Sequence, residues 1–106
     1  MAARRRRVEW TRRAVDALEE ALAFVATDSP PAAERLLDRL LRAAASLSEL
    51  TERGRRLPEL NDPNVREPII PPYRLIYEYD AESVRILALL HDAQDFRLRL
   101  RDGRET

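Results

Sequence analysis

The sequence predicts an α+β domain in which a helical hairpin packs on an antiparallel sheet, with the element order β-α-α-β-β-β. Two observations carry this prediction. The first is a pair of amphipathic helical patterns joined by the short segment 27–31, and the second is a group of three strand-like runs after residue 64. So short a connection between two helices indicates an antiparallel hairpin. The 106 residues are expected to form a single domain, 1–106, because domains cluster near about 100–150 residues.

The first helix is expected to begin after Thr11, whose hydroxyl can cap the backbone N–H groups of a first turn. Apolar residues then recur at spacings of three, four and three, which is the stripe of an amphipathic helix. They are Val15, Leu18, Leu22 and Val25. The segment 27–31 ends in two prolines, which the first turn of a following helix tolerates.

The second helix is predicted from about residue 31 to residue 51, with an apolar stripe wide enough to contact both a helix and a sheet. The stripe consists of Leu36, Leu37, Leu40, Leu41, Ala44 and Leu47. Gly54 follows at a position where the C-cap of a helix favours a positive φ angle. We therefore expect Gly54 to end this helix.

Four strands are expected from the alternation of apolar and polar residues. They cover residues 4–10, 65–70, 73–79 and 84–91. The last of these runs is apolar on both faces, which predicts a central strand covered on both sides, and a turn at 80–83 joins it to the preceding strand. Pro68 cannot donate a ladder hydrogen bond, so it indicates an edge strand or a bulge. The tail segment 96–101 also alternates like a strand, although a short helix fits it too.

The formal net charge is zero, because 19 acidic residues balance 19 basic residues, all of them arginine. This sum conceals a net charge of +5 over residues 1–13 and of −5 over residues 14–52. Arginine suits bidentate recognition of phosphate and carboxylate, whereas the codon bias of a GC-rich genome gives the same excess without any function. The Arg4–Arg7 run is a candidate nucleic-acid anchor, and a solvated N-terminus explains it equally well.

Composition excludes several classes of function. The absence of cysteine excludes a disulfide framework, a thiolate metal site and a cysteine nucleophile, and it fits a cytoplasmic location. No apolar run reaches the roughly 20 residues that span a bilayer, and none follows Arg4–Arg7 as in a targeting segment. Two glycines cannot build a phosphate-binding loop, and one histidine without cysteine excludes the usual structural zinc sites. We therefore expect no cofactor and no metal.

Three residues are candidates for a site: His91, Arg74 and Arg66. His91 ends the most buried predicted strand, where it is either an acid, base or phosphate ligand or a histidine that only closes the strand through a hydrogen bond. If the strands that carry Arg66 and Arg74 pair, both guanidinium groups reach one sheet face near His91 and form a cationic site of phosphate size. The alternative pairs Arg66 with Glu67, or Arg74 with Glu78, as ordinary surface charges. The spacing favours neither interpretation.

Several short motifs are weak alone but specific in their order and spacing. They are Val8-Glu9-Trp10-Thr11 with Ala14, Asp28-Ser29-Pro30-Pro31-Ala32-Ala33, Gly54-Arg55-Arg56 with Pro58-Glu59, Val65-Arg66-Glu67, Tyr73-Arg74-Leu75-Ile76-Tyr77, and Ile86-Leu87 through His91. In this combination nearly the whole chain resembles the RelE/ParE superfamily of toxins from bacterial type II toxin–antitoxin modules. The resemblance implies a microbial-ribonuclease-like fold and a cognate antitoxin that folds onto the toxin. Operator DNA would be reached only through that antitoxin.

Two activities divide the superfamily that the chain resembles. RelE-like members cut mRNA on the ribosome with a cluster of basic residues, which would here be Arg74, Arg66 and His91. ParE-like members instead poison DNA gyrase and have no established catalytic residues. Pro68 and Gln94 stand where the RelE-like pattern has basic residues, so the sequence is more similar to the ParE-like branch.

Three hypotheses for the function follow from this resemblance. The first is a toxin that inhibits DNA gyrase and replication without catalysis. The second is a ribosome-dependent mRNA endoribonuclease, for which Arg74→Ala is expected to abolish toxicity without a large loss of thermal stability. The third is a degenerate toxin that acts only in antitoxin binding and co-repression of its own operon.

Overall fold

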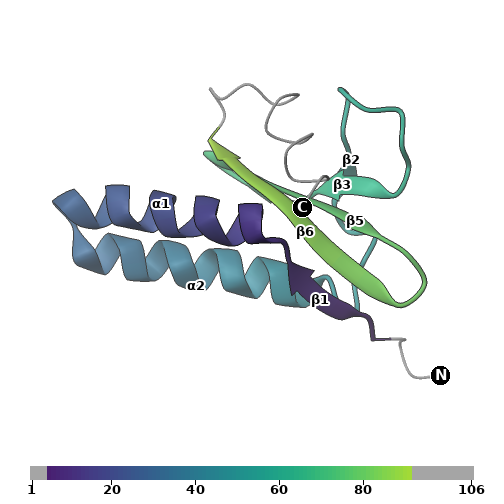
Figure 1. Ribbon diagram of the computed structural model, residues 1–106, viewed down its shortest axis with the longest axis horizontal. Coiled ribbons are helices and arrows are strands. Elements are labelled where there is room, and N and C mark those ends of the chain that lie inside the picture. Colours follow the sequence, from purple (N-terminus) through teal and green to yellow (C-terminus); the bar gives the residue numbers. More distant parts are fainter. Residues whose placement is uncertain (1–4, 92–106) are drawn as a thin grey trace.

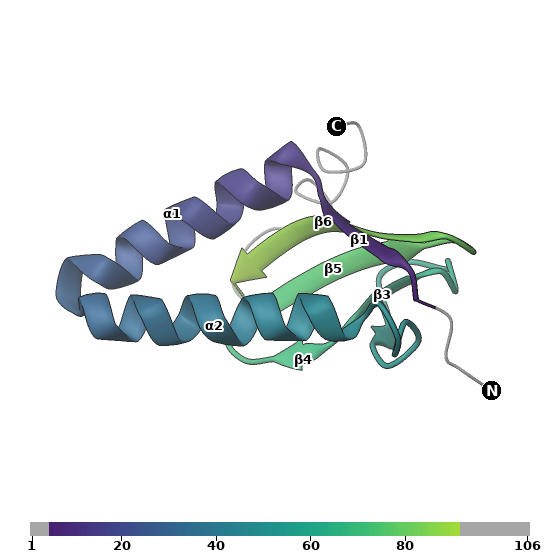
Figure 2. The same cartoon turned by 90° about the horizontal axis from the view of Figure 1, so that it is seen from below.

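The computed structural model describes residues 5–91, in which two helices cover one side of a six-stranded sheet (Figures 1 and 2). In chain order the elements are β1 (Arg7–Trp10), α1 (Arg12–Asp28), α2 (Pro30–Ser46), β2 (Arg55–Arg56), β3 (Val65–Glu67), β4 (Ile69–Ile70), β5 (Tyr73–Tyr79) and β6 (Ser83–His91). The predicted α+β class with its helical hairpin is confirmed. The predicted tail strand over 96–101 lies outside the described residues. Neither of the two described helices is long and apolar enough to cross a membrane.

Each helix of the hairpin begins after a residue whose hydroxyl caps it. The Thr11 hydroxyl accepts a hydrogen bond from the backbone N–H of Ala14 (3.2 Å) and caps α1. Ser29 is the single residue between the helices, and its hydroxyl accepts the backbone N–H of Ala32 (3.2 Å) to cap α2. The prolines occupy the first turn of α2, where the N–H groups that they lack would have no helical partner.

The second helix ends at Ser46, five residues earlier than the predicted end at residue 51. The Ser46 hydroxyl donates to the carbonyl oxygen of Ala43 (2.7 Å), and the Thr51 hydroxyl donates to that of Leu47 (2.7 Å). Side-chain hydroxyl groups that bond to nearby carbonyl groups offer the backbone an alternative to the helix. The segment after Ser46 therefore forms successive turns.

Gly54 does not cap the helix, and its φ angle is not positive, so that prediction is wrong. Its function is to allow a close approach. The Tyr77 hydroxyl accepts a hydrogen bond from the Gly54 N–H (3.2 Å) and donates to the carbonyl oxygen of Thr51. A Cβ atom at Gly54 would lie 2.8 Å from the Tyr77 hydroxyl oxygen and 2.9 Å from the Glu67 carbonyl carbon.

The sheet has the strand order β1-β6-β5-β3-β2, with β4 paired to β5 beside β3. All pairs are antiparallel except β1 with β6, which run parallel from Arg7 beside Ser83 to Trp10 beside Ile86. The sheet is therefore mixed rather than wholly antiparallel. The predicted strand over 65–70 is divided at Pro68, because proline has no N–H group for the ladder.

Strand β6 lies between β1 and β5 and is buried on both faces, as predicted. Its helix-side residues, such as Ile86 and Leu89, belong to the main core with α1, α2 and the tyrosine-bearing face of β5. Its opposite face packs with Leu57 and Leu60 from the segment between β2 and β3. The β5–β6 register contains one irregularity, where Ile76 pairs with Ala88 but Tyr77 pairs with Ile86.

Replacing Gly54 by alanine should lower the free energy of unfolding by about 1–3 kcal/mol, because overpacking a buried site forces neighbouring atoms to move. One neighbour is backbone, at Glu67, and cannot rotate away. Urea denaturation would measure the change. The double variant Gly54→Ala/Tyr77→Phe is the control. It removes the tyrosine oxygen but keeps the clash with the Glu67 backbone, so the part of the stability loss that is due to Glu67 should remain. Unchanged stability of Gly54→Ala would contradict the close approach.

Candidate functional site

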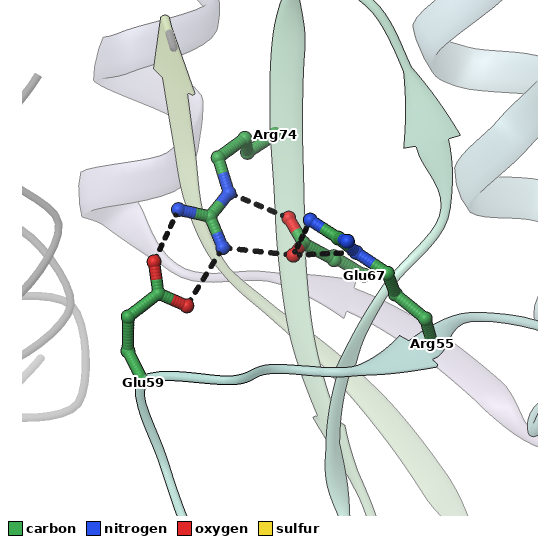
Figure 3. A network of polar contacts seen from close by, with 4 residues as sticks. All are labelled: Arg55, Glu59, Glu67 and Arg74. Carbon is green, nitrogen blue, oxygen red and sulfur yellow. Dashed lines mark hydrogen bonds and ion pairs between the residues drawn. The ribbon is translucent and has the colours of Figure 1, made fainter. Parts of the chain in front are cut away.

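The most densely bonded polar group on the sheet is the guanidinium of Arg74 on β5 (Figure 3). Its Nε and Nη2 atoms donate to the carboxylate of Glu67 at 2.7 and 2.8 Å. Its Nη1 and Nη2 atoms donate to the carboxylate of Glu59 at 2.8 and 3.0 Å. One arginine thus engages two carboxylates, each in a bidentate arrangement.

Glu67 is the buried partner of this network, with a side chain only 3% exposed. It lies on β3 directly opposite Arg55 of β2, and cross-strand neighbours share a face of the sheet. The Arg55 guanidinium accordingly contacts the Glu67 carboxylate at 3.0 Å. Two arginines therefore compensate one buried carboxylate, as a charge in a poorly solvated position requires.

Glu59 comes from the irregular segment 57–64 that links β2 and β3. Leu57 and Leu60 of this segment pack on the sheet face that points away from the helices. This packing places the Glu59 carboxylate over Arg74 (Figure 3). Hydrogen bonding to Arg74 holds the pKa of Glu59 below its usual range. Hydrogen bonds to Glu67 first and then to Glu59 raise the pKa of Arg74, so Arg74 and Glu59 are both charged at neutral pH.

The three candidate residues from the sequence do not meet. Arg74 pairs with Leu90, whose side chain belongs to the core on the face away from the helices. His91 pairs with Tyr73, the neighbour of Arg74, and residues adjacent in a strand point to opposite faces. The rings of His91 and Tyr73 meet edge to face with centroids 5.7 Å apart.

Arg66 also lies apart from Arg74. It pairs with Tyr77, which belongs to the helix-side core. Its guanidinium donates to the carbonyl oxygens of Pro63 and Gly54, each at 3.1 Å, and approaches Glu52 at 3.8 Å. Arg66 thus connects the backbone at Gly54 with the backbone at Pro63 beside β3.

The alternative prediction was that Arg66 and Arg74 form ordinary ion pairs. Both arginines do contact carboxylates, but the predicted partners are wrong. Arg66 and Glu67 are consecutive in β3, so their side chains point to opposite faces. Arg74 and Glu78 share a face of β5 but are separated by about 13 Å, four residues at about 3.3 Å each. Glu78 instead contacts Arg85 of β6 at 3.2 Å.

One signal for this network was present in the sequence. Glu67 is an acidic residue within a run that was predicted to be a strand, and a buried carboxylate needs partners. That signal indicates that a partner exists but does not identify it. The positions of Arg55 and Glu59 relative to Glu67 depend on the course of the irregular segment 57–64, which the sequence pattern does not predict.

The described part of the Arg4–Arg7 run is bound within the protein. Arg6 donates to the carbonyl oxygen of Asp80 (2.7 Å) and to the Thr51 hydroxyl (3.1 Å), and its guanidinium lies over the Tyr79 ring, 5.7 Å from the centroid. Its neighbours are in exposed ion pairs, Arg5 with Glu49 and Arg7 with Glu9. Arg6 is thus held within the protein, whereas the side chains of Arg5 and Arg7 remain 80% and 72% exposed.

A groove of about 480 Å³ lies between α1 and the end of β6. Arg13, Glu20 and His91 supply its polar lining, and Phe24 stands on its exposed rim. Within residues 5–91 no group of three or more histidine, aspartate or glutamate side chains is arranged to hold a metal ion. The groove is thus lined by apolar residues together with the charged or polar side chains of Arg13, Glu20 and His91.

Comparison with known proteins identifies the family. A model of the ParE toxin of type II toxin–antitoxin systems, parDE, matches residues 8–96, and the chain therefore belongs to this family. Toxin RelE2 of Caulobacter vibrioides is 38% identical over 88 residues, which cover 82% of this chain and 96% of that protein. The chain is accordingly a type II toxin of the ParE/RelE superfamily.

Two solved structures share the fold. A chain of the chromosomal ParDE toxin–antitoxin system from P. aeruginosa has a TM-score of 0.67 at 18% identity, covering 84% of this chain and 98% of that one. A chain of the RelBE2 toxin–antitoxin complex from Mycobacterium tuberculosis has a TM-score of 0.59 at 26% identity, covering 85% and 94%. The fold expected from the resemblance is therefore confirmed.

Glu67→Gln should lower the free energy of unfolding by about 2–4 kcal/mol, because removing one partner of a buried ion pair leaves the other uncompensated. Glu78→Gln is the matched control. It breaks a more exposed pair on the same sheet and should change stability by less than about 1 kcal/mol. Chemical denaturation of both variants would test this, and equal losses would show that burial of Glu67 carries no special weight.

The stabilisation from Glu59 should disappear in acid. Its folded pKa is below its usual value, so the ion pair contributes fully above the usual range near 4.3 and is lost as the pH falls through the folded pKa. Wild type should therefore exceed Glu59→Gln in unfolding free energy at pH 6, and the difference should shrink towards pH 3. Urea titrations across this range measure both curves. A difference that is independent of pH would exclude an ionised Glu59 as its source.

Proposed function

We propose that this toxin inhibits DNA gyrase, and with it replication, by binding rather than by catalysis, and that a cognate antitoxin neutralises it. The solved neighbours come from a ParDE toxin–antitoxin system and a RelBE2 toxin–antitoxin complex, which supports an antitoxin as the direct partner. In this proposal operator DNA is contacted only through the antitoxin, and no membrane or cofactor takes part.

The engagement of Arg74 is the observation that carries this proposal. Cleaving RNA requires cationic groups aimed at the charge that develops on the phosphate. Arg74 instead makes four hydrogen bonds to two carboxylates, and Arg66 donates to two backbone carbonyl groups. His91 lies on the opposite face from Arg74. These contacts favour a toxin that lacks an RNA-cleaving centre.

Because Arg74 is bound to two carboxylates, a toxicity assay of Arg74→Ala would measure folding as well as catalysis. For an endoribonuclease, the sequence predicts that Arg74→Ala abolishes toxicity and leaves thermal stability largely intact. In the structure this change would leave the buried Glu67 with Arg55 alone and Glu59 without its partner. Loss of toxicity in Arg74→Ala would therefore not separate catalysis from folding, so an exposed residue is the better choice.

Expression without the antitoxin tests the proposal. We expect filamentation, an SOS response and intact mRNA in cells, and inhibition of supercoiling when the purified toxin is added to purified gyrase. His91→Gln is the matched variant, because this side chain is exposed and its replacement should not disturb folding. A gyrase toxin should retain its effect in this variant.

Other outcomes would overturn the proposal. Rapid, codon-linked mRNA cleavage that His91→Gln abolishes would identify a ribosome-dependent endoribonuclease with Arg74, Arg66 and His91 as its candidate residues. Normal growth at a confirmed expression level would leave a degenerate toxin that acts in antitoxin binding and operon co-repression.

A further inference from the structure

We propose that Arg74, held in place by Glu67, forms a binding site for an acidic side chain of a polypeptide partner, and that Glu59 occupies this site in the free protein as an internal substitute. The inference does not depend on whether the toxin acts on gyrase or on mRNA. It rests on the unequal positions of the two carboxylates that Arg74 binds (Figure 3).

The two carboxylates differ in how firmly they are held. Glu67 belongs to a strand, is 3% exposed and is bound by both Arg74 and Arg55. Glu59 belongs to an irregular segment, is 31% exposed, and its carboxylate has Arg74 as its one side-chain partner among residues 5–91. Withdrawing Glu59 therefore requires only the movement of a partly solvated side chain, whereas withdrawing Glu67 would dismantle the sheet edge.

The geometry of Arg74 suits an exchange of one carboxylate for another. Glu67 fixes the guanidinium through Nε and Nη2, so the plane and direction of the group are set without Glu59. The Nη1 and Nη2 edge then presents two parallel donors, the arrangement that planar carboxylates match. An incoming carboxylate would find a preorganised donor pair, which reduces the entropy lost on binding.

The surface beside Arg74 supplies a place for the rest of such a partner. A pocket of about 190 Å³ is lined by Arg55, Glu67, Tyr73 and Arg74 together with residues 68–71. Ile69 of this rim is 75% exposed, and large apolar side chains so exposed often mark contact surfaces. The chemistry fits a segment that carries an aspartate or glutamate next to an apolar residue.

The charge of the network favours a single carboxylate over a polyanion. Within the set of Arg55, Glu59, Glu67 and Arg74 the charges balance, and withdrawing Glu59 leaves the other three with a net charge of +1. One carboxylate restores neutrality. A nucleic-acid backbone would bring further phosphates close to the retained Glu67 and the displaced Glu59, which repel them.

Titration of the folded toxin with minimal anions tests the proposal. Acetate is the carboxylate probe and dimethyl phosphate is the phosphodiester probe of the same charge, each followed by the backbone amide NMR signals of residues 55, 67 and 74 at low ionic strength. Removing the internal competitor with Glu59→Ala should tighten acetate binding by at least about tenfold relative to wild type. Glu59→Gln, which retains the side-chain volume, should give a smaller gain.

Glu78→Ala is the matched control, because Glu78 is 27% exposed and also pairs with an arginine, Arg85, across the same sheet. Its acetate affinity at the Arg74 signals should equal that of wild type. No gain in Glu59→Ala, or an equal gain in Glu78→Ala, would overturn the proposal. A larger gain for dimethyl phosphate than for acetate would also overturn it, in favour of a nucleic-acid ligand.

Discussion

Strand β6 is apolar on both faces, and the need to cover both faces organises the rest of the molecule. The helical hairpin covers one face, and the segment between β2 and β3 covers the other through Leu57 and Leu60. A strand of this kind is ordinary in a parallel sheet packed between two layers of helices. Here the second layer is a short irregular segment without the regular internal hydrogen bonds that make a helix rigid.

The ion-pair network meets this need for anchorage. Glu59 ties the covering segment to Arg74, and Glu67 with Arg55 fixes Arg74 to the sheet edge. In the free protein the network therefore connects the second layer to the sheet, and the charges of its four residues balance. The contact is directional and adds to the packing of Leu57 and Leu60, which hold the segment on the sheet independently of Glu59.

Much of the fold could be predicted because it depends on local signals. Thr11 and Ser29 cap helices through bonds within three residues, and the double-sided apolar pattern of β6 predicts its central place. The parallel pairing of β1 with β6 could not be predicted in this way, since it joins segments more than seventy residues apart. The role of Gly54 could not be predicted for a related reason, because its constraint comes from Tyr77 and Glu67, which are distant in sequence. The contacts of the candidate site could be predicted less well. The alternation along β3 and β5 decides which charged side chains share a face, and Glu59 reaches Arg74 from an irregular segment.

The irregular register between β5 and β6 absorbs one additional residue without changing the sidedness of the end of the sheet. Leu87 is that residue, opposite no residue of β5, and the pairs on both sides of it stay aligned. His91 therefore keeps the helix-side face of its partner Tyr73, although strict alternation from Val84 and Ile86 would place it on the face of Arg74. Loss of Leu87 alone would leave the only histidine of the chain on the helix side. Bringing the imidazole and the guanidinium to one face would instead require the end of β6 to slip by one residue against β5, which would also turn the buried leucines of that end to the opposite faces.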